Sequence, residues 1–179
     1  MAETEVPRPT RGERRPRDMA LSLVVLLVPV LVVVLIYRVV QGGEQPVTVD
    51  TAPVLAQARS AGAFPVSEPS GLGDDWLPIS ASFQQADGGR VLRIGYVTPD
   101  DAGVQLIQSD VPAERLLPAE LTAQNEARGG VDVDGQAWQR YTARPGEAAL
   151  VLLQPDRTLI IVGNADEREL NELAAALTP

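Results

Sequence analysis

The 179-residue chain contains no cysteine and no histidine, and all fifteen of its basic residues are arginine. Without cysteine there are no disulfides, so any domain outside the cytoplasm must be held by its hydrophobic core alone. The two absences exclude Ser-His-Asp and Cys-His catalysis, the usual zinc sites, haem ligation and thiol redox chemistry. Only carboxylates, three tyrosines and arginines remain for acid–base work. We therefore predict a protein that is not an enzyme and has no catalytic residue, metal or cofactor.

The longest apolar run predicts a membrane-spanning helix over residues 19–40. Residues 19–37 read MALSLVVLLVPVLVVVLIY and carry no charge. At a rise of about 1.5 Å per residue, such a helix covers roughly the 30 Å hydrocarbon thickness of a bilayer. A helix in a soluble core is rarely apolar on every side for five turns. Transmembrane helices tolerate proline, so Pro29 does not argue against the prediction. The lipid bilayer is the partner expected for residues 19–40.

The charges beside this segment predict its orientation. Five arginines precede it, whereas Arg59 is the first basic residue after Arg38. Basic residues remain in the cytoplasm, so residues 1–18 form a cytoplasmic, Arg-rich tail and the rest of the chain lies outside. A signal peptide has a shorter apolar core and a small-residue cleavage site. The sequence after residue 35 offers no good site of that kind, which favours an uncleaved, single-pass anchor in the cell membrane.

The part of the chain after the apolar run is strongly acidic. It contains nine arginines against twenty aspartates and glutamates. Phosphate binding requires clustered basic residues, so nucleic acid is not an expected partner. The same charge argues against a domain that lies flat on anionic lipid.

Residues 41–49 form a short linker, and residues 50–179 form one domain with antiparallel strands and helices. Strands are predicted over 76–85, 90–98, 104–110, 131–133, 136–144, 148–154 and 158–165, separated by turn residues. Helices are predicted over 50–62, over 111–130 with an interruption at Pro118 and a stop at Gly129, and over 166–179. Strands joined in hairpins, with helices at the connections, indicate the α+β class.

Several segments in this order resemble one family. They are TAPVLAQARSAGAFPVSEPSGLGDDWLPISASF from residue 51, GYVTPD, VDGQAWQRY and the late ELNELAAAL. Together they are similar to an actinobacterial family catalogued as domain of unknown function 4245 (DUF4245). The resemblance implies a single-pass, envelope-facing protein, and it brings no assigned activity or site residues. More loosely, the layout is similar to Mog1/PsbP-like folds, a comparison at the level of fold only.

The segment SGLGDDWLPISASF, residues 70–83, has the composition of a possible site. Asp74 and Asp75 could act as the acids of a glycosidase, with Trp76 stacking on a sugar. Adjacent residues in a strand point to opposite faces, however, and no partner acid is located. We favour a loop whose aspartates accept hydrogen bonds from main-chain N–H groups before Trp76 enters the core.

Residues 132–136, DVDGQ, resemble the start of a calcium loop. The further ligands are missing, and Ala143 stands where a bidentate glutamate is required. A type I′ hairpin at Asp134-Gly135 explains the residues better. Trp138 and Tyr141 lie three apart in the following strand, so we expect them to face opposite sides, with one in the core and the other a surface anchor.

The function predicted is a membrane-anchored, extracytoplasmic binding or protein-interaction module of the cell envelope. Its partner would be another envelope protein. The alternative is a tethered carrier or sensor of a small ligand or lipid, with a pocket lined by Trp76, Trp138 or Tyr96. A flat, exposed apolar patch would favour a protein partner. Two acids about 5–10 Å apart in a cleft would favour a carboxylate-based enzyme.

Overall fold

The computed structural model describes residues 16–41 and 47–177, and within the first of these ranges it describes the side chains of residues 23–36. Two compact units, Met1–Gln45 and Pro46–Pro179, make up the chain. Residues 1–15 of the predicted cytoplasmic tail and residues 42–46 of the predicted linker lie outside the described residues.

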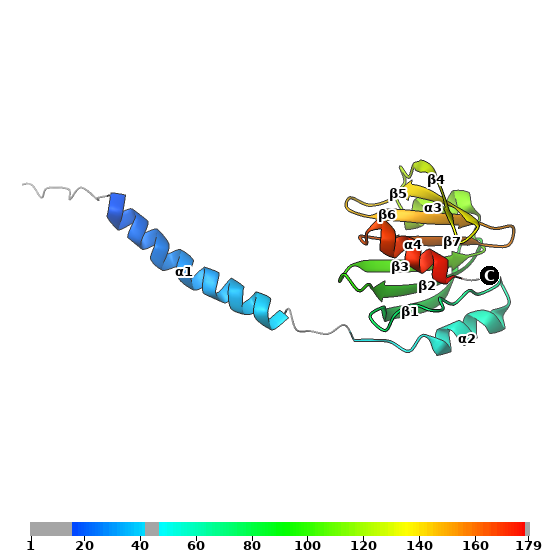
Figure 1. Ribbon diagram of the computed structural model, residues 1–179, viewed down its shortest axis with the longest axis horizontal. Helices are drawn as coiled ribbons and strands as arrows, with labels where there is room; N and C mark the ends of the chain where they lie inside the picture. The colour runs from blue at the N-terminus through cyan, green and yellow to red at the C-terminus, as the bar shows by residue number, and fades with distance from the viewer. Residues whose placement is uncertain (1–15, 42–46, 178–179) are drawn as a thin grey trace, which may run out of the picture. The chain divides into compact units, whose positions relative to one another are not determined.

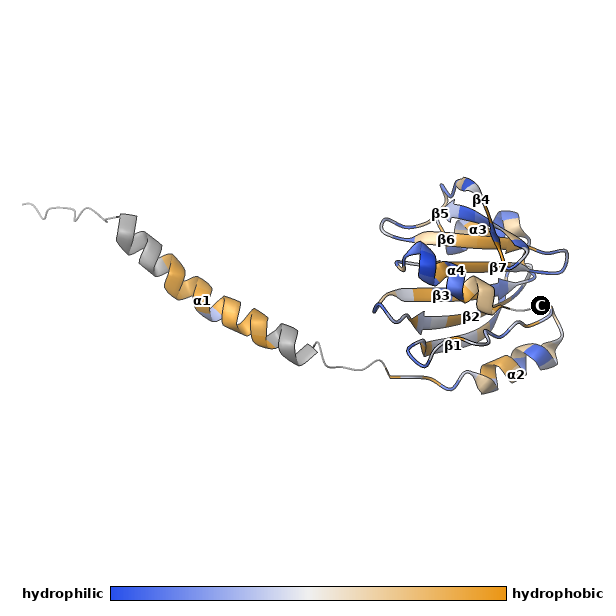
Figure 2. Ribbon diagram, viewed as in Figure 1, coloured by the Kyte–Doolittle hydropathy of each residue, from blue (hydrophilic) through white to orange (hydrophobic). Residues whose placement is uncertain are grey.

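Helix α1 (Pro16–Gln41) is the one element described in the first unit. The large apolar side chains of residues 23–36 are between 47% and 68% exposed, and Figure 2 shows this stretch in hydrophobic colours. In the part of the chain that the structure describes, no helix is both long enough and apolar enough to cross a membrane. The predicted span, residues 19–40, includes side chains outside that part and remains a prediction.

The second unit is built on one antiparallel sheet of seven strands, which confirms the predicted α+β class. The order across the sheet is β1-β2-β3-β7-β6-β5-β4. The chain therefore forms two meanders that join where β3 pairs with β7 (Figure 1). The strands are β1 (Leu77–Ala86), β2 (Gly89–Val97), β3 (Gly103–Ser109), β4 (Ala127–Val133), β5 (Gln136–Thr142), β6 (Ala148–Leu153) and β7 (Thr158–Gly163).

Helices α2 (Ala52–Ala61) and α4 (Glu167–Ala176) cover one face of the sheet. Helix α2 ends at Gly62, whose φ of +59° suits glycine, as predicted. Asp166 caps helix α4, because its carboxylate accepts the Glu169 N–H at 2.9 Å. The Glu169 carboxylate accepts the Asp100 N–H at 3.1 Å, so it does not complete a reciprocal capping box. The core on this face includes Leu55, Leu106, Trp138, Ile161, Leu170 and Leu173.

Helix α3 (Ala113–Glu120) covers the opposite face. Its Leu116 and Leu117 belong to a second buried cluster with Ile107, Val151 and Ile160 of the central strands. In Figure 1 α4 lies in front of the sheet and α3 behind it. The two-sided cover explains why β6 and β7 are apolar at almost every position.

The predicted helix over residues 111–130 is wrong in its second half. Helix α3 contains Pro118 but ends at Glu120, and a turn closes between the Asn125 N–H and the Thr122 carbonyl at 3.2 Å. Strand β4 then begins at Ala127, where a helix was expected. Gly129, the predicted stop, lies instead at a register shift within β4. Pairing with β5 decides this segment, because its own residues favour neither state.

Candidate functional site

A pocket of about 260 Å³ lies between α4 and the neighbouring ends of β5 and β6. Ala148, Ala149 and Leu150 of β6 form its apolar floor, and Leu170 and Asn171 of α4 form a wall. We call it the Arg140–Glu167 pocket. Its remaining lining residues are Arg128, Arg140, Tyr141, Thr142, Glu147 and Glu167.

Strand register brings these residues together from distant parts of the chain. Arg140 of β5 lies opposite Leu150 of β6, and both point to the face that α4 covers. On the other side Arg140 lies opposite Gly129 of β4. Gly129 has a φ of +117°, and the register of β4 shifts between Ala127 and Gly129. This bulge and the missing side chain leave the β4 side of the pocket uncovered.

Three arginine–glutamate pairs surround the pocket. The Nε of Arg140 lies 3.3 Å from Oε1 of Glu167. Arg144 lies 3.6 Å from Glu147, and Arg128 lies 3.5 Å from Glu126. Exposed pairs of this kind contribute at most about 1 kcal/mol each to stability. Their importance here is that positive and negative charges balance around the pocket, on a domain that is otherwise acidic.

Two polar atoms of the lining are shielded from solvent, and each lies in an ion pair that is not aligned as a hydrogen bond. They are the Nε of Arg140, 3.3 Å from Oε1 of Glu167, and the Oε2 of Glu147, 3.6 Å from a guanidinium nitrogen of Arg144. The charges that line the pocket are therefore paired within the protein.

Two acids line the pocket, and each lies beside an arginine: Glu167 beside Arg140 and Glu147 beside Arg144. Among the described residues, no group of three acidic side chains could hold a metal ion. The apolar floor and the paired charges of the pocket are suited to binding.

A second pocket, of about 290 Å³, lies between residues 109–113 and the β6–β7 turn at residues 153–158. It lies beside the buried side chain of Arg157, which is 7% exposed. Arg157 donates hydrogen bonds to Gln154 Oε1 at 2.7 Å, to Ser67 Oγ at 3.0 Å and to the Pro65 carbonyl. Burial lowers the pKa of the Arg157 guanidinium, although nearby Asp156 opposes this effect.

The contacts of Arg157 give it a structural role. Gln108, which is fully buried in β3, accepts from Arg157 at 3.3 Å and from the Ser67 N–H at 2.9 Å, and it donates to the Ser67 carbonyl at 2.6 Å. The network fastens the irregular segment after α2 to the β6–β7 turn. Because the donors of Arg157 are directed into this network, the second pocket is a weaker candidate for a binding site.

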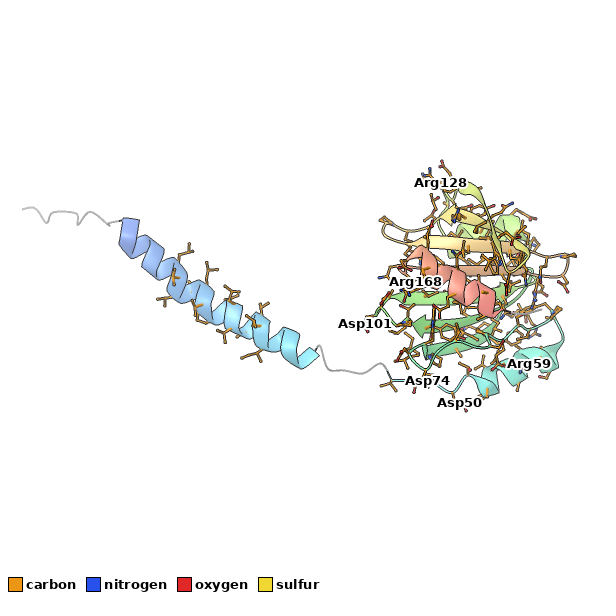
Figure 3. All side chains as sticks on the ribbon, viewed as in Figure 1. Asp50, Arg59, Asp74, Asp101, Arg128 and Arg168 are labelled. Atoms are coloured by element: carbon orange, nitrogen blue, oxygen red, sulfur yellow. The ribbon has the colours of Figure 1, made fainter. Side chains whose placement is uncertain are left out.

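Asp74 and Asp75 do not form a site. Both are exposed in a turn, and neither lines the two pockets. The prediction that their carboxylates accept main-chain hydrogen bonds is wrong: the turn is closed by the Trp76 N–H and the Gly73 carbonyl at 3.1 Å. Trp76 is 5% exposed and belongs to the core, as predicted. Figure 3 shows Asp74 at the surface of the domain.

Residues 132–136 form the predicted hairpin turn. Asp134 and Gly135 have φ values of 54° and 78°, as the two central residues of a type I′ turn require. The Asp132 carboxylate accepts the Gly135 N–H at 3.1 Å. The aspartates of this segment therefore shape a turn.

The aromatic residues that would have indicated a ligand cavity belong to the cores. Trp138 is 1% exposed beneath α4, and Tyr141 packs on the opposite cluster, which confirms that the two face opposite ways. Tyr96 stacks edge-on against Trp76, with ring centroids 6.3 Å apart. Burial, with a smaller effect of Glu68, raises the pKa of Tyr96 to about 12. None of Trp76, Tyr96 and Trp138 lines the Arg140–Glu167 pocket.

Comparison with known families identifies the family of the chain. Residues 11–177 match the model of a family described as "Protein of unknown function (DUF4245)". The chain belongs to the DUF4245 family. No curated protein and no solved structure matched it. The similarity to Mog1/PsbP-like folds therefore remains a prediction.

Membership of the DUF4245 family brings no residue roles, so those of this member come from its own geometry. Sequence reasoning did not find Arg128, Arg140, Glu147 or Glu167, which come from three strand ends and a helix. The sequence contains one local signal for this region, the two adjacent glycines Gly129 and Gly130 in a segment of mixed charge. Glycine inside a strand marks a bulge or a close approach of another backbone.

Proposed function

We propose that the chain is a membrane-anchored binding and protein-interaction module of the cell envelope, without enzymatic activity, whose residues 50–179 lie outside the cytoplasm. The observation that carries the proposal is the Arg140–Glu167 pocket beside the open end of the sheet at β4. An apolar floor bordered by paired charges suits recognition of a partner.

The anchor is proposed from the sequence. Residues 19–37 carry no charge, and five arginines precede them. The described side chains of α1 support the proposal, because residues 23–36 carry large apolar groups and no charge. A membrane tether would raise the effective concentration of the domain for partners in the same membrane.

The alternative, a carrier of a small ligand or lipid, has less support. Sites for such ligands have volumes of about 300–1,000 Å³ and enclose most of the ligand. The Arg140–Glu167 pocket, at about 260 Å³, is smaller than this range. It is suited to one protruding group of a larger partner.

Two measurements on the full-length protein in its own membrane test the proposal. A reporter fused after Pro179 should be active only outside the cytoplasm, and activity only inside would overturn the topology. A photo-crosslinking residue at Asn171, in the pocket, should give adducts that the same residue at Asp87 does not give. Asp87 is a matched control because it is fully exposed and lies far from the pocket in the chain. Equal labelling from both positions would contradict a binding site at the pocket.

A further inference from the structure

We infer that residues 50–70 form a hinged strap, which leaves the sheet as a unit while the strands, α3 and α4 stay folded. The strap consists of α2 and the irregular segment that follows it. It comes directly after residues 41–49, through which the proposed anchor joins the domain, so strain along this tether reaches the strap before it reaches the sheet. The effect of strain rests on the proposed function, whereas the strap itself rests on contacts within the domain.

The strap contributes no strand to the sheet. In the described part of the chain, its main chain bonds to the rest of the domain at three residues. The Ser67 N–H and carbonyl bond to the side chain of Gln108, the Pro65 carbonyl accepts from Arg157, and the Ser70 N–H donates to the Ala176 carbonyl at 2.9 Å. A strand would lose a whole ladder of such bonds on leaving the sheet, so the strap is the easier part to detach.

The two helices on this face of the sheet differ in how much they bury. Both are ten residues long, but α2 buries only Leu55 and Ala58, whereas α4 buries five residues. Helix α2 packs on β1 at the edge of the sheet, and α4 packs on β6 and β7 nearer its middle (Figure 1). After α2, the strap adds Phe64, whose ring lies edge-on to Phe83 at 6.4 Å. Because apolar burial is the main stabilising force, α2 detaches more readily than α4.

The segment GLGDD, residues 71–75, has the properties of a hinge. Gly71 has a φ of +80°, and a Cβ at either Gly71 or Gly73 would meet no atom within 4 Å. The main chain can therefore turn here without striking a neighbour. Directly after the hinge, Trp76 is buried in the core and bonded to Glu172 of α4 at 3.1 Å. This contact keeps the start of β1 in place when the strap moves.

A buried polar network holds the strap on the sheet. Gln108 accepts the Ser67 N–H at 2.9 Å, and Arg157 donates to Ser67 Oγ at 3.0 Å. The acceptors of the buried Arg157 guanidinium are all neutral groups, which belong to Gln154, Pro65, Gln108 and Ser67. A cation that is buried among neutral groups has lost its hydration without gaining a counter-charge in contact. Detachment of the strap returns water to the guanidinium, which offsets part of the loss of these bonds.

The strap lies between the tether and the sheet in the order of the chain. Just before it, the Val49 N–H donates to the Pro78 carbonyl at 2.8 Å, which joins the chain to β1. A pull on residue 47 therefore acts first on this bond and then on α2, before it loads any pair of strands. Detachment of the strap uncovers Phe83 of β1, which Phe64 contacts in the closed state. Strain along the tether thus exposes an apolar surface while the sheet stays folded.

Because the chain has no cysteine, single engineered thiols test the strap directly. Ala58→Cys in α2 and Ala174→Cys in α4 are a matched pair: both positions are at most 2% exposed, and both belong to the same hydrophobic cluster. A thiol reagent is added to each full-length variant in detergent, without denaturant. Modification of Ala58→Cys should be at least about a hundredfold faster, because a detached helix of ten residues is marginal in water and exposes its side chains.

Leu116→Ala separates detachment of the strap from global unfolding. Leu116 of α3 packs in the cluster on the opposite face, so its truncation brings the closed state and the open-strap state equally closer to the unfolded state. Added to Ala174→Cys, it should speed modification at least about tenfold. Added to Ala58→Cys, it should change the rate less than about twofold. Equal rates for the two cysteine variants, or equal acceleration of both by Leu116→Ala, would overturn the inference.

Amide exchange of the unmodified protein is a second measurement that needs no substitution. The amides of Leu55 and Ala58 should exchange at least about a hundredfold faster than those of Ile160 and Ile161 in β7. Equal protection of the two pairs would mean that the strap does not open separately. The reporter fused after Pro179 tests the anchor independently. If the domain proves cytoplasmic while the thiol rates differ as expected, the strap stands and its link to the membrane does not.

Discussion

Trp76 and Glu172 are joined by a hydrogen bond of 3.1 Å from the indole Nε1 to the carboxylate Oε1. The bond attaches the residue before β1 to helix α4, near the other end of the domain sequence. It also satisfies the one polar atom of a side chain that is otherwise packed in the core. A tryptophan that looks like a sugar-binding residue in the sequence is therefore a closing contact of the fold.

This contact predicts that substitution of Trp76 lowers stability much more than substitution of the two aspartates before it. Trp76→Ala should lower the free energy of unfolding by about 3–5 kcal/mol, because it opens a large cavity beside Tyr96. Changing both Asp74 and Asp75 to Asn should leave stability nearly unchanged, since neither carboxylate makes a described hydrogen bond. Urea denaturation of the two variants measures both effects. A large loss in the double aspartate variant would show that the turn depends on its carboxylates.

The buried network around Arg157 predicts that substitution of Arg157 lowers stability more than substitution of a surface arginine. Arg157→Met leaves the Pro65 carbonyl and Ser67 Oγ without the arginine donor, while Gln108 Oε1 keeps the Ser67 N–H. Each unsatisfied buried acceptor costs about 1–3 kcal/mol, so the free energy of unfolding should fall by at least about 2 kcal/mol.

The matched control for this change is Arg59→Met. Arg59 pairs with Glu68 at 2.6 Å, but both side chains are half exposed, so the loss should stay below about 1 kcal/mol. Denaturant midpoints of the two variants give the comparison. Equal losses would mean that the Arg157 network contributes no more than a surface pair.

Much of the fold could be predicted from local patterns. Asp134-Gly135 predicted a two-residue hairpin because both positions need a positive φ, and Gly62 predicted the end of α2 for the same reason. Strand β4 was missed over Ala127–Gly130, because two glycines and an arginine have little intrinsic strand preference. Its pairing with β5 supplies the strand structure, and pairing is not visible in a short window of sequence.

The candidate site could not be predicted, for a related reason. Arg140 and Glu167 come together only because α4 packs across the sheet and β5 takes one particular register with β6. A one-residue slip would place Arg140 on the opposite face. In the same way, nothing in the turn segment around Arg157 indicated that its guanidinium is buried.

The close contact between β3 and β7 predicts that a single methyl group added at Gly163 destabilises the domain. A Cβ at Gly163 would lie 2.8 Å from the Cα of Val104 and closer still to the Gly103 carbonyl oxygen. Both contacts are with backbone, so the strands themselves would have to move. Gly163→Ala should therefore destabilise the domain by about 1–3 kcal/mol. Gly73→Ala is the control, because a Cβ there meets nothing within 4 Å; thermal unfolding should leave it near the parent value.

Tyr96 predicts how stability changes at high pH. Burial raises the pKa of Tyr96 to about 12 in the folded domain, from 10.0 for an ordinary tyrosine. Below pH 10 both states hold the proton and the folded state has its full stability. Between pH 10 and about 12 only the unfolded state loses the proton, so the free energy of unfolding falls, by about 1.4 kcal/mol per unit of pKa difference. Denaturant unfolding at several pH values should show this fall in the parent and in Tyr141→Phe. In Tyr96→Phe, the fall in the free energy of unfolding between pH 10 and about 12 should be about 2–3 kcal/mol smaller than in the parent. An unchanged slope in that variant would assign the effect to another group.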